Sequence, residues 1–216
     1  MKLLRTGIAA LDEFLRGGLP PAVLILLGPL ESGNEIFARQ IAYARAKDTG
    51  ITYITFAKPL ESVKDDMTAY GWDTSQLEKS GKWKFVKVDQ TKQLSQAVKT
   101  EMNQHRCIII DSLSDLLLTQ DVEEAISLIN TMSAINKETE ELHLLLLTQG
   151  MQDTRAETAV QHYAEGVIYF NTTWGSELAT RAIIIKKMRG TILPPRSLPY
   201  TIGIRGFTVE TATRIT

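Results

Sequence analysis

The sequence has little cysteine, almost no net charge and no long apolar run. Cys107 is the one cysteine among 216 residues, so no disulfide can form within the chain, and we expect a reducing compartment. Lys and Arg total 24 and Asp and Glu total 25, which gives a net charge of −1. No apolar run approaches the roughly 20 residues of a membrane-spanning helix. Because Asp12 and Glu13 interrupt the only stretch that resembles a signal peptide, we expect a cytoplasmic protein without membrane contact.

The histidines form no recognisable metal or catalytic constellation. His105 and Cys107 stand two positions apart and would share one face of a strand, but no further ligand is spaced to complete a site. His143 begins an apolar run, and His162 lies near a predicted helix end. We therefore predict structural roles for all three histidines and no metal site.

What the sequence does contain is a regular alternation of apolar strands and amphipathic helices. This alternation predicts an α/β protein with a mostly parallel central sheet, flanked by helices on both faces. Closely spaced strands near the C-terminus predict an antiparallel extension of that sheet. No repeat or linker divides the chain, so we expect a single domain over residues 1–216. The predicted strands are 22–27, 51–56, 83–88, 107–111, 142–147, 166–170, 181–187, 200–204 and 207–210, and the predicted helices are 6–16, 34–47, 59–70, 93–103 and 121–137.

The organising stretch is residues 26–35, where the first core strand ends in a loop and a helix begins. Gly28 and Gly33 have the spacing of a P-loop, G-x-x-x-x-G-K-[ST]. The two residues that perform the chemistry do not match. Asn34 stands in place of the lysine, and Glu35 stands in place of the serine or threonine.

These replacements change the charge of the loop, which consists of Gly28, Glu31, Ser32, Gly33, Asn34 and Glu35 together with two apolar residues. In a working P-loop the lysine reaches the β- and γ-phosphates, and the hydroxyl holds Mg²⁺. Asn34 is neutral and short, and Glu31 and Glu35 place carboxylates beside a polyanion. Like charges 4 Å apart repel by about 1 kcal/mol in water and about 4 kcal/mol at an effective dielectric of 20. We therefore predict weak triphosphate binding. The alternative is that Glu35 only stabilises the helix, because an acidic residue in the first turn interacts favourably with the helix dipole, and that no ligand uses the site.

Asp111 is the second candidate, at the carboxyl end of the apolar strand 107–111. Ligands of open α/β sheets bind at this end of the strands, and in P-loop proteins a carboxylate here holds Mg²⁺. The alternative is that Asp111 caps the next helix. Its combination with the glycine loop favours the Mg²⁺-type position.

Together, these features resemble the RecA-like ATPases and, within them, the KaiC-like family. The resemblance extends over nearly the whole chain, in the order of the family's motifs. The matching segments are "TGI…LD…GGLP" at 6–20, "GWD" at 71–73, the Walker B segment "IDS" at 110–112, a stretch similar to "KLRGT" at 186–191 and one similar to "YPFTI" at 199–202.

The resemblance also implies that catalytic parts are missing. The family carries two glutamates after the second strand, which activate the attacking water, and this chain has Ala57 and Lys58 there. With the phosphate lysine, the metal hydroxyl and the general base all replaced, we expect no turnover. The interpretation is a catalytically inactive regulatory or scaffolding subunit. ATP and Mg²⁺ are expected as ligands only if the altered loop still binds them.

In the family's hexamers, the lysine and arginine of "KLRG" reach the γ-phosphate bound to a neighbouring subunit. Lys187 and Arg189 stand at these positions. The resemblance implies that this subunit offers trans-acting cations to an active partner, or that it self-associates through RecA-like faces. The alternative is that both are ordinary exposed cations at a strand end.

Two other functions fit parts of the sequence. A divergent ATPase could use Lys58 in place of the lost phosphate lysine. A recombinase-like module could bind single-stranded DNA through a loop at 150–162. That loop is nearly neutral, with one aromatic residue, Tyr163, at its edge. Single-strand binding generally uses basic grooves with stacking aromatics, so we expect no nucleic-acid partner.

Overall fold

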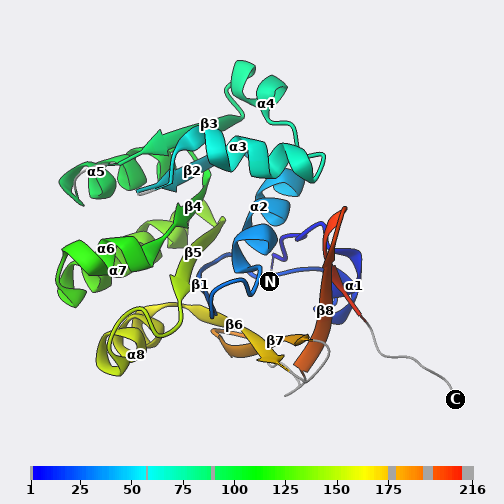
Figure 1. Ribbon diagram of the computed structural model, residues 1–216. Coiled ribbons are helices and arrows are strands. Elements are labelled where there is room, and N and C mark those ends of the chain that lie inside the picture. The colour runs from blue at the N-terminus through cyan, green and yellow to red at the C-terminus, as the bar shows by residue number, and fades with distance from the viewer. Residues whose placement is uncertain (1, 57, 89–90, 175–178, 192–196, 211–216) are drawn as a thin grey trace, which may run out of the picture.

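The computed structural model describes residues 2–56, 58–88, 91–174, 179–191 and 197–210. A nine-stranded sheet with the order β3-β2-β4-β5-β1-β6-β7-β8-β9 runs through these residues (Figure 1). The first six strands, β1 to β6, all run parallel to one another. Their bounds are β1 (Ala22–Gly28), β2 (Ile51–Thr55), β3 (Trp83–Lys87), β4 (Cys107–Asp111), β5 (Leu142–Thr148) and β6 (Gly166–Trp174).

Helices cover both faces of the parallel strands, which explains why these strands are continuously apolar. In β1, Leu24 and Leu26 belong to the core on one face, and Ile25 and Leu27 belong to the core on the other. The first face carries α1 (Ala9–Phe14), α2 (Asn34–Arg45), α3 (Leu60–Ala69) and α4 (Ser75–Lys79). The second carries α5 (Thr91–Met102), α6 (Leu113–Thr119), α7 (Val122–Thr139) and α8 (Thr154–Tyr163).

The C-terminal strands form the predicted antiparallel extension. They are β7 (Ala179–Met188), β8 (Ser197–Gly203) and β9 (Gly206–Val209), each antiparallel to the strand before it. The β8–β9 hairpin lies against α2, where the Gln40 side chain accepts a hydrogen bond from the backbone N–H of Phe207 and donates one to its carbonyl. The Phe207 and Phe37 ring centroids are 5.1 Å apart. The hairpin therefore packs on the helix that follows the glycine loop.

Helices α4 and α6 were not predicted, and of α8 only an end near His162 was indicated. The prediction of a loop at 150–162 was wrong, because most of this stretch is α8. The Asp153 side chain caps α8 by accepting a hydrogen bond from the N–H of Ala156 (2.9 Å), and Ser112 caps α6 through a capping box with Asp115. Both helices are short, so their apolar periodicity is weak and their caps are the clearest local signal. Within the described residues, no helix combines the length and apolar character needed to cross a bilayer.

Candidate functional site

The glycine loop lies at the carboxyl edge of the sheet, where β1 ends at Gly28 and α2 begins at Asn34. The register places Thr55 beside Asp111 and Gly28 beside Thr148, so the carboxyl ends of these strands meet at one edge. A pocket of about 230 Å³ opens there. Its lining brings together five residues named from the sequence, Glu31, Asn34, Glu35, Lys58 and Asp111. The rest of the lining is Pro29, Leu30, Ser112, Asp115, Leu146, Thr148 and Met151.

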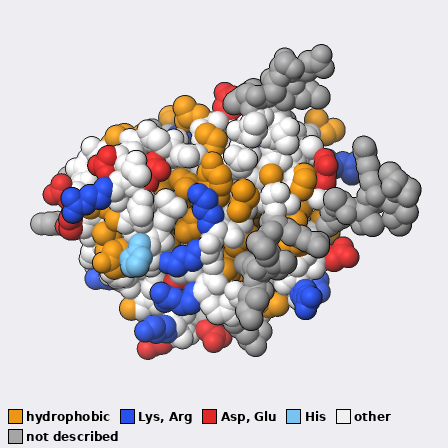
Figure 2. All heavy atoms as spheres, turned by 90° about the horizontal axis from the view of Figure 1, so that it is seen from below, with side chains coloured by type: hydrophobic (Ala, Val, Ile, Leu, Met, Phe, Trp, Pro, Cys, Tyr) orange, Lys and Arg blue, Asp and Glu red, His pale blue; other side chains and the backbone are white. Residues whose placement is uncertain are grey.

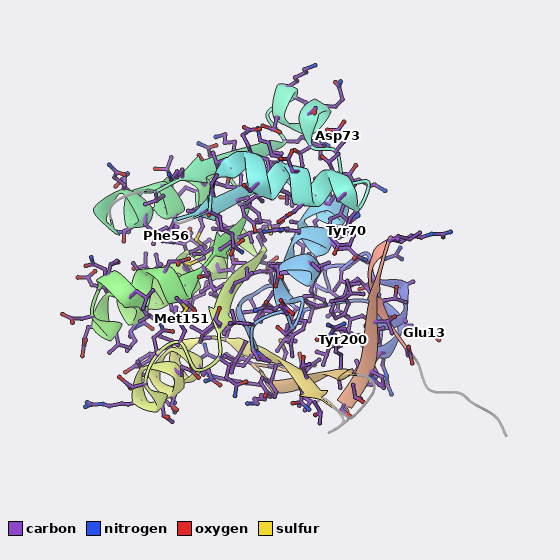
Figure 3. The ribbon with its side chains drawn as sticks, in the orientation of Figure 1. Glu13, Phe56, Tyr70, Asp73, Met151 and Tyr200 are labelled. Atoms are coloured by element: carbon purple, nitrogen blue, oxygen red, sulfur yellow. The ribbon has the colours of Figure 1, made fainter. Side chains whose placement is uncertain are left out.

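The two loop glycines are required by close packing. A Cβ atom on Gly28 would lie 2.3 Å from Ser32 Oγ, and one on Gly33, which has φ +80°, would lie 2.2 Å from Ile202 Cδ1. Tyr200 projects from the same strand as Ile202, β8, and its hydroxyl donates to the Ser32 carbonyl at 2.5 Å (Figure 3). The β8–β9 hairpin thus supports the loop, and the shape of the loop is explained without a ligand.

Asn34 turns back into the protein. Its side chain is buried, with Nδ2 donating to the Leu26 carbonyl at 3.0 Å and Oδ1 accepting the N–H of Glu35 at 3.0 Å. The N–H of Ser32 donates to the Pro29 carbonyl at 3.2 Å. N–H groups of such a loop and helix start are the donors that bind phosphate in a P-loop. Two of these donors are therefore taken by the protein's own oxygens.

Asp111 is 2 % exposed, and both of its carboxylate oxygens are occupied by the protein. Oδ2 accepts from the Tyr53 hydroxyl at 2.5 Å and from Arg39 Nη2 at 3.3 Å, and Oδ1 lies 3.5 Å from Lys58 Nζ. The alternative that Asp111 caps the next helix was wrong, because the cap of α6 is Ser112. An arginine, a lysine and a phenol surround the carboxylate at the Mg²⁺-type position.

Comparison with known proteins identifies the family. The family model described as "ATPase: KaiC" matches residues 4–214. The chain belongs to the KaiC family. This confirms the predicted resemblance to KaiC-like ATPases of the RecA superfamily.

Relatives in several organisms are similar over most of the chain. A UPF0273 protein of Thermotoga maritima is 25 % identical over 234 residues, covering 97 % of this chain and 96 % of the relative. The circadian clock protein KaiC3 of Synechocystis is 35 % identical over 86 residues, which is 38 % of this chain and 17 % of that protein. The crystal structure of a KaiC-like protein from Pyrococcus horikoshii aligns with a TM-score of 0.81 at 23 % identity and covers 97 % of this chain and 99 % of that chain. The structural match confirms the predicted fold.

In this KaiC-family domain, Arg39 holds the Asp111 network together. It is buried in α2, and its Nε donates to the Tyr53 hydroxyl at 3.0 Å while its Nη1 pairs with Asp66 at 2.9 Å. Burial lowers the pKa of Arg39, but Tyr53, Asp111 and Asp66 outweigh burial, so the net direction is upward. Burial and Asp111 raise the pKa of Tyr53. The Arg39 guanidinium therefore stays charged. The Tyr53 phenol stays protonated and donates its hydrogen bond to Asp111.

Sequence reasoning missed Arg39, Tyr53 and Tyr200. One signal for Arg39 existed, because it stands one turn before the buried Ala42 on α2, where a lone cation needs a buried partner. The identity of that partner could not be read from the pattern, because Asp111 is 72 positions away.

The pocket lining of this KaiC-family domain carries more carboxylates than cations. Glu31, Glu35, Asp111 and Asp115 line it, against Lys58. Glu31 is exposed and Glu35 is half-buried, and neither forms an ion pair with any residue in the described part of the chain. A polyphosphate entering this pocket would meet net negative charge.

The residues that replace the family's two glutamates are described only in part. Ala57 lies outside the described residues. Lys58 has a half-exposed side chain, with its amino group directed at Asp111 inside the pocket. A cation therefore stands near the place where the family resemblance puts a general base.

Lys187 and Arg189 lie away from the pocket. Met188, which stands between them, pairs with Gly166, and Gly166 pairs with Leu24 in the first half of β1. The glycine loop follows the last residue of β1, so the two cations lie toward the other edge of the sheet. Lys187 Nζ donates to the carbonyls of Gln161 (3.3 Å) and His162 (2.6 Å) at the end of α8. Burial, with Arg189 nearby, lowers the pKa of Lys187.

The Arg189 side chain is 65 % exposed, and its Nη1 is 3.7 Å from Glu165 Oε1. Arg189 is therefore more available than Lys187 to another molecule. Because both residues lie toward the amino edge of the sheet, any contact with a nucleotide-type site would be made in a different molecule.

The histidines and the cysteine do not join the pocket. His143 is fully buried, where Nδ1 accepts from the N–H of Ile108 and Nε2 contacts Asn136 Oδ1. Burial, with Arg45 nearby, lowers the pKa of His143 to about 3. Burial raises the pKa of the Cys107 thiol to about 12. Among the residues that the structure describes, no group of three or more His, Cys, Asp or Glu is arranged to hold a metal ion.

Proposed function

We propose that this KaiC-family ATPase domain is catalytically inactive and acts as a regulatory or scaffolding subunit. The observation that supports this most directly is the occupation of Asp111. Asp111 Oδ2 accepts from Tyr53 and Arg39, and Oδ1 faces Lys58 at 3.5 Å, so a metal ion would have to compete with three protein partners. Mg²⁺ would have to displace a buried ion pair whose parts are hydrogen-bonded to one another, which is energetically costly.

The loop supports the same proposal from the phosphate side. The family's lysine is replaced by Asn34, whose neutral amide is engaged by the Leu26 carbonyl and the Glu35 N–H. Glu31 and Glu35 add negative charge at the position of the phosphates. Because phosphoryl transfer depends on positioned positive charge, this site lacks the main source of catalysis.

The proposed role is exerted through contacts with another protein, either a related active subunit or a further copy of this chain. Arg189 is the best candidate for a trans-acting cation, since its side chain is mostly exposed. If it serves an active partner, Arg189→Ala will lower the partner's stimulated ATPase rate. Lys99→Glu, on the exposed side of α5, serves as the matched surface control.

The test of inactivity is a thermal-shift titration with Mg·ATP and Mg·ADP. A ligand at 100 times its Kd stabilises a fold by about 2.7 kcal/mol, or several degrees for a chain of this size. We expect no shift for the native chain. The variant N34K/E35T restores the P-loop residues, and N34K/E35T/R39L also removes the arginine from Asp111. The proposal expects the nucleotide to raise the melting temperature of the triple variant more than that of the double variant. It also expects this rise to depend on Mg²⁺ only in the triple variant.

A divergent nucleotide-binding protein is the second candidate, and the position of Lys58 favours it. The Lys58 amino group faces the pocket and is half-exposed, so it is near enough to meet an anion there. A clear shift of the native chain that is lost in Lys58→Ala would establish this function and overturn the first.

A further inference from the structure

A groove lies along the outer side of α7, next to the end of α8. One wall is Tyr163, the last residue of α8, which is 42 % exposed although its ring is large. Figure 2 views the molecule from below, the side on which α8 lies in Figure 1, and shows hydrophobic side chains exposed among charged ones. The other wall belongs to α7 and consists of Glu123, Ile126, Ser127, Asn130, Thr131 and Ala134.

The α7 wall forms one stripe along the helix. Its residues recur at intervals of three and four positions, and Lys137 continues this spacing, so all of them lie on one face. We name Glu123, Ile126, Ser127, Asn130, Thr131, Ala134 and Lys137 the α7 stripe. A surface helix ordinarily carries charged residues on its outer side, whereas the middle of this stripe is uncharged and its side chains are mostly short. A second helix can therefore approach it closely.

The two ends of the α7 stripe carry opposite charges. Glu123 and Lys137 are exposed, and neither forms an ion pair in the part of the chain that the structure describes. Each stands seven positions from Asn130, which is therefore the midpoint of the stripe. A two-fold rotation about an axis at Asn130 brings Glu123 of one copy opposite Lys137 of the other, and it does so twice.

We propose that the α7 stripe is a contact between two copies of this chain, with their α7 helices antiparallel and Asn130 at the centre. The same rotation brings Ile126 of one copy opposite Ala134 of the other. Tyr163 of each copy would pack against the α7 helix of its partner. Because the stripe becomes complementary to itself when it is reversed, its charges favour a second copy as the occupant of the groove.

Asn130 would fix the register of this contact. Its amide carries both hydrogen-bond donors and an acceptor, so two Asn130 side chains that meet at a two-fold axis can bond to one another. A single asparagine within the contact surface sets the register of coiled coils in the same way. A shift of one helix by one turn would separate the two amides and would also remove both Glu123–Lys137 pairs.

This inference goes beyond the proposed function and does not depend on it. The contact is isologous, because both copies use the same surface, and it closes after two subunits. No residue of the α7 stripe lines the pocket at the glycine loop. Association should therefore proceed without nucleotide and should be unchanged by N34K/E35T. A monomeric chain that shows no nucleotide shift would contradict the dimer and leave the proposed inactivity intact.

The test is sedimentation velocity of the full chain without nucleotide, at concentrations up to on the order of 100 μM. We expect a dimer. Glu123→Lys alone and Lys137→Glu alone each turn both end pairs into like charges, so each should raise the dissociation constant by on the order of 10-fold or more. An equimolar mixture of the two variants should form dimers again, because one copy then carries only lysines at these ends and the other only glutamates.

Two charge reversals outside the α7 stripe serve as matched controls. Glu124→Lys alters the neighbouring exposed acid in the first turn of α7, and Lys99→Glu alters an exposed lysine in the last turn of α5. Each repeats the effect of a test variant on a helix dipole without changing the stripe, so both should leave the dissociation constant unchanged. Circular dichroism verifies that every variant is folded.

Three outcomes would overturn the inference. The first is a native chain that stays monomeric throughout the concentration range. The second is association that the Glu123 and Lys137 reversals leave unchanged, which would place the contact elsewhere. The third is a mixture of the two reversed variants that stays monomeric, because the antiparallel register requires them to pair.

Discussion

Helix α2 carries two buried arginines, Arg39 and Arg45, and their surroundings differ in an instructive way. They are six positions apart, or about 9 Å along the helix, so one lies near the carboxyl edge of the sheet and the other near the amino edge. Arg45 forms a short hydrogen-bonded pair with Glu141, directly before β5. Arg39 pairs with Asp111, at the end of β4.

The two pairs use the same chemistry in different positions. The amino-edge pair neighbours the fully buried His143 and Cys107, and neither of its residues lines the pocket at the carboxyl edge. Asp111 of the carboxyl-edge pair lines a pocket at the position where the KaiC-like resemblance puts Mg²⁺. A buried arginine–carboxylate pair is therefore structural at one edge and, in our proposal, a block on ligand binding at the other.

Replacing Arg45 should have the largest effect. Arg45→Met leaves Glu141 without its cation, and removing one partner of a buried pair generally costs about 3–5 kcal/mol. Chemical denaturation should show a loss of this size. Mg²⁺ should not restore it, because Glu141 does not line the pocket at the carboxyl edge.

Replacing Arg39 in the same way sharpens the comparison. Arg39→Met should cost less, about 2–4 kcal/mol, because Tyr53 and Lys58 still contact Asp111. Here millimolar Mg²⁺ should recover part of the loss, since the freed carboxylate faces a pocket. Calorimetry with and without Mg²⁺ measures this, and an equal response of the two arginine variants would contradict the distinction between the edges.

Acid should weaken the amino edge selectively. The folded pKa of His143 is lowered to about 3, whereas the unfolded value is near 6.5. The unfolded chain therefore binds an extra proton between these values, and the stability that His143 contributes is fully present above about pH 6.5 and is lost as pH falls toward 3. The slope is at most about 1.4 kcal/mol per pH unit from this group. Denaturation between pH 7 and pH 4 should show a smaller slope for His143→Phe than for the native chain.

Removing Lys58 should have the smallest effect on stability. Its side chain is half-exposed and its amino group is 3.5 Å from Asp111 Oδ1, so Lys58→Ala should change the free energy of unfolding by less than about 1 kcal/mol. A loss as large as that of Arg39→Met would mean that Lys58, and not Arg39, is the main cation on Asp111.

The predicted strands and the placement of the candidate residues followed from local pattern. The apolar runs ending at Gly28 and Asp111 are parallel neighbours of β5 with their carboxyl ends at one edge, as their continuous apolar character predicts. The body of helix α8 was missed because its ten residues have few apolar positions, whereas α4 and α6, with five and seven residues, are too short to show a helical period.

The sequence by itself determined the family, the alternation of strands and helices, and the replacement of the P-loop residues by Asn34 and Glu35, because each depends on residues close together in the chain. Only the tertiary structure decided what occupies the site. The contacts of Asp111 with Arg39, Tyr53 and Lys58 and the support of the loop by Tyr200 join residues separated by 53 to 168 positions. Such pairings depend on strand order and helix position, which place buried groups side by side and leave no trace in local periodicity.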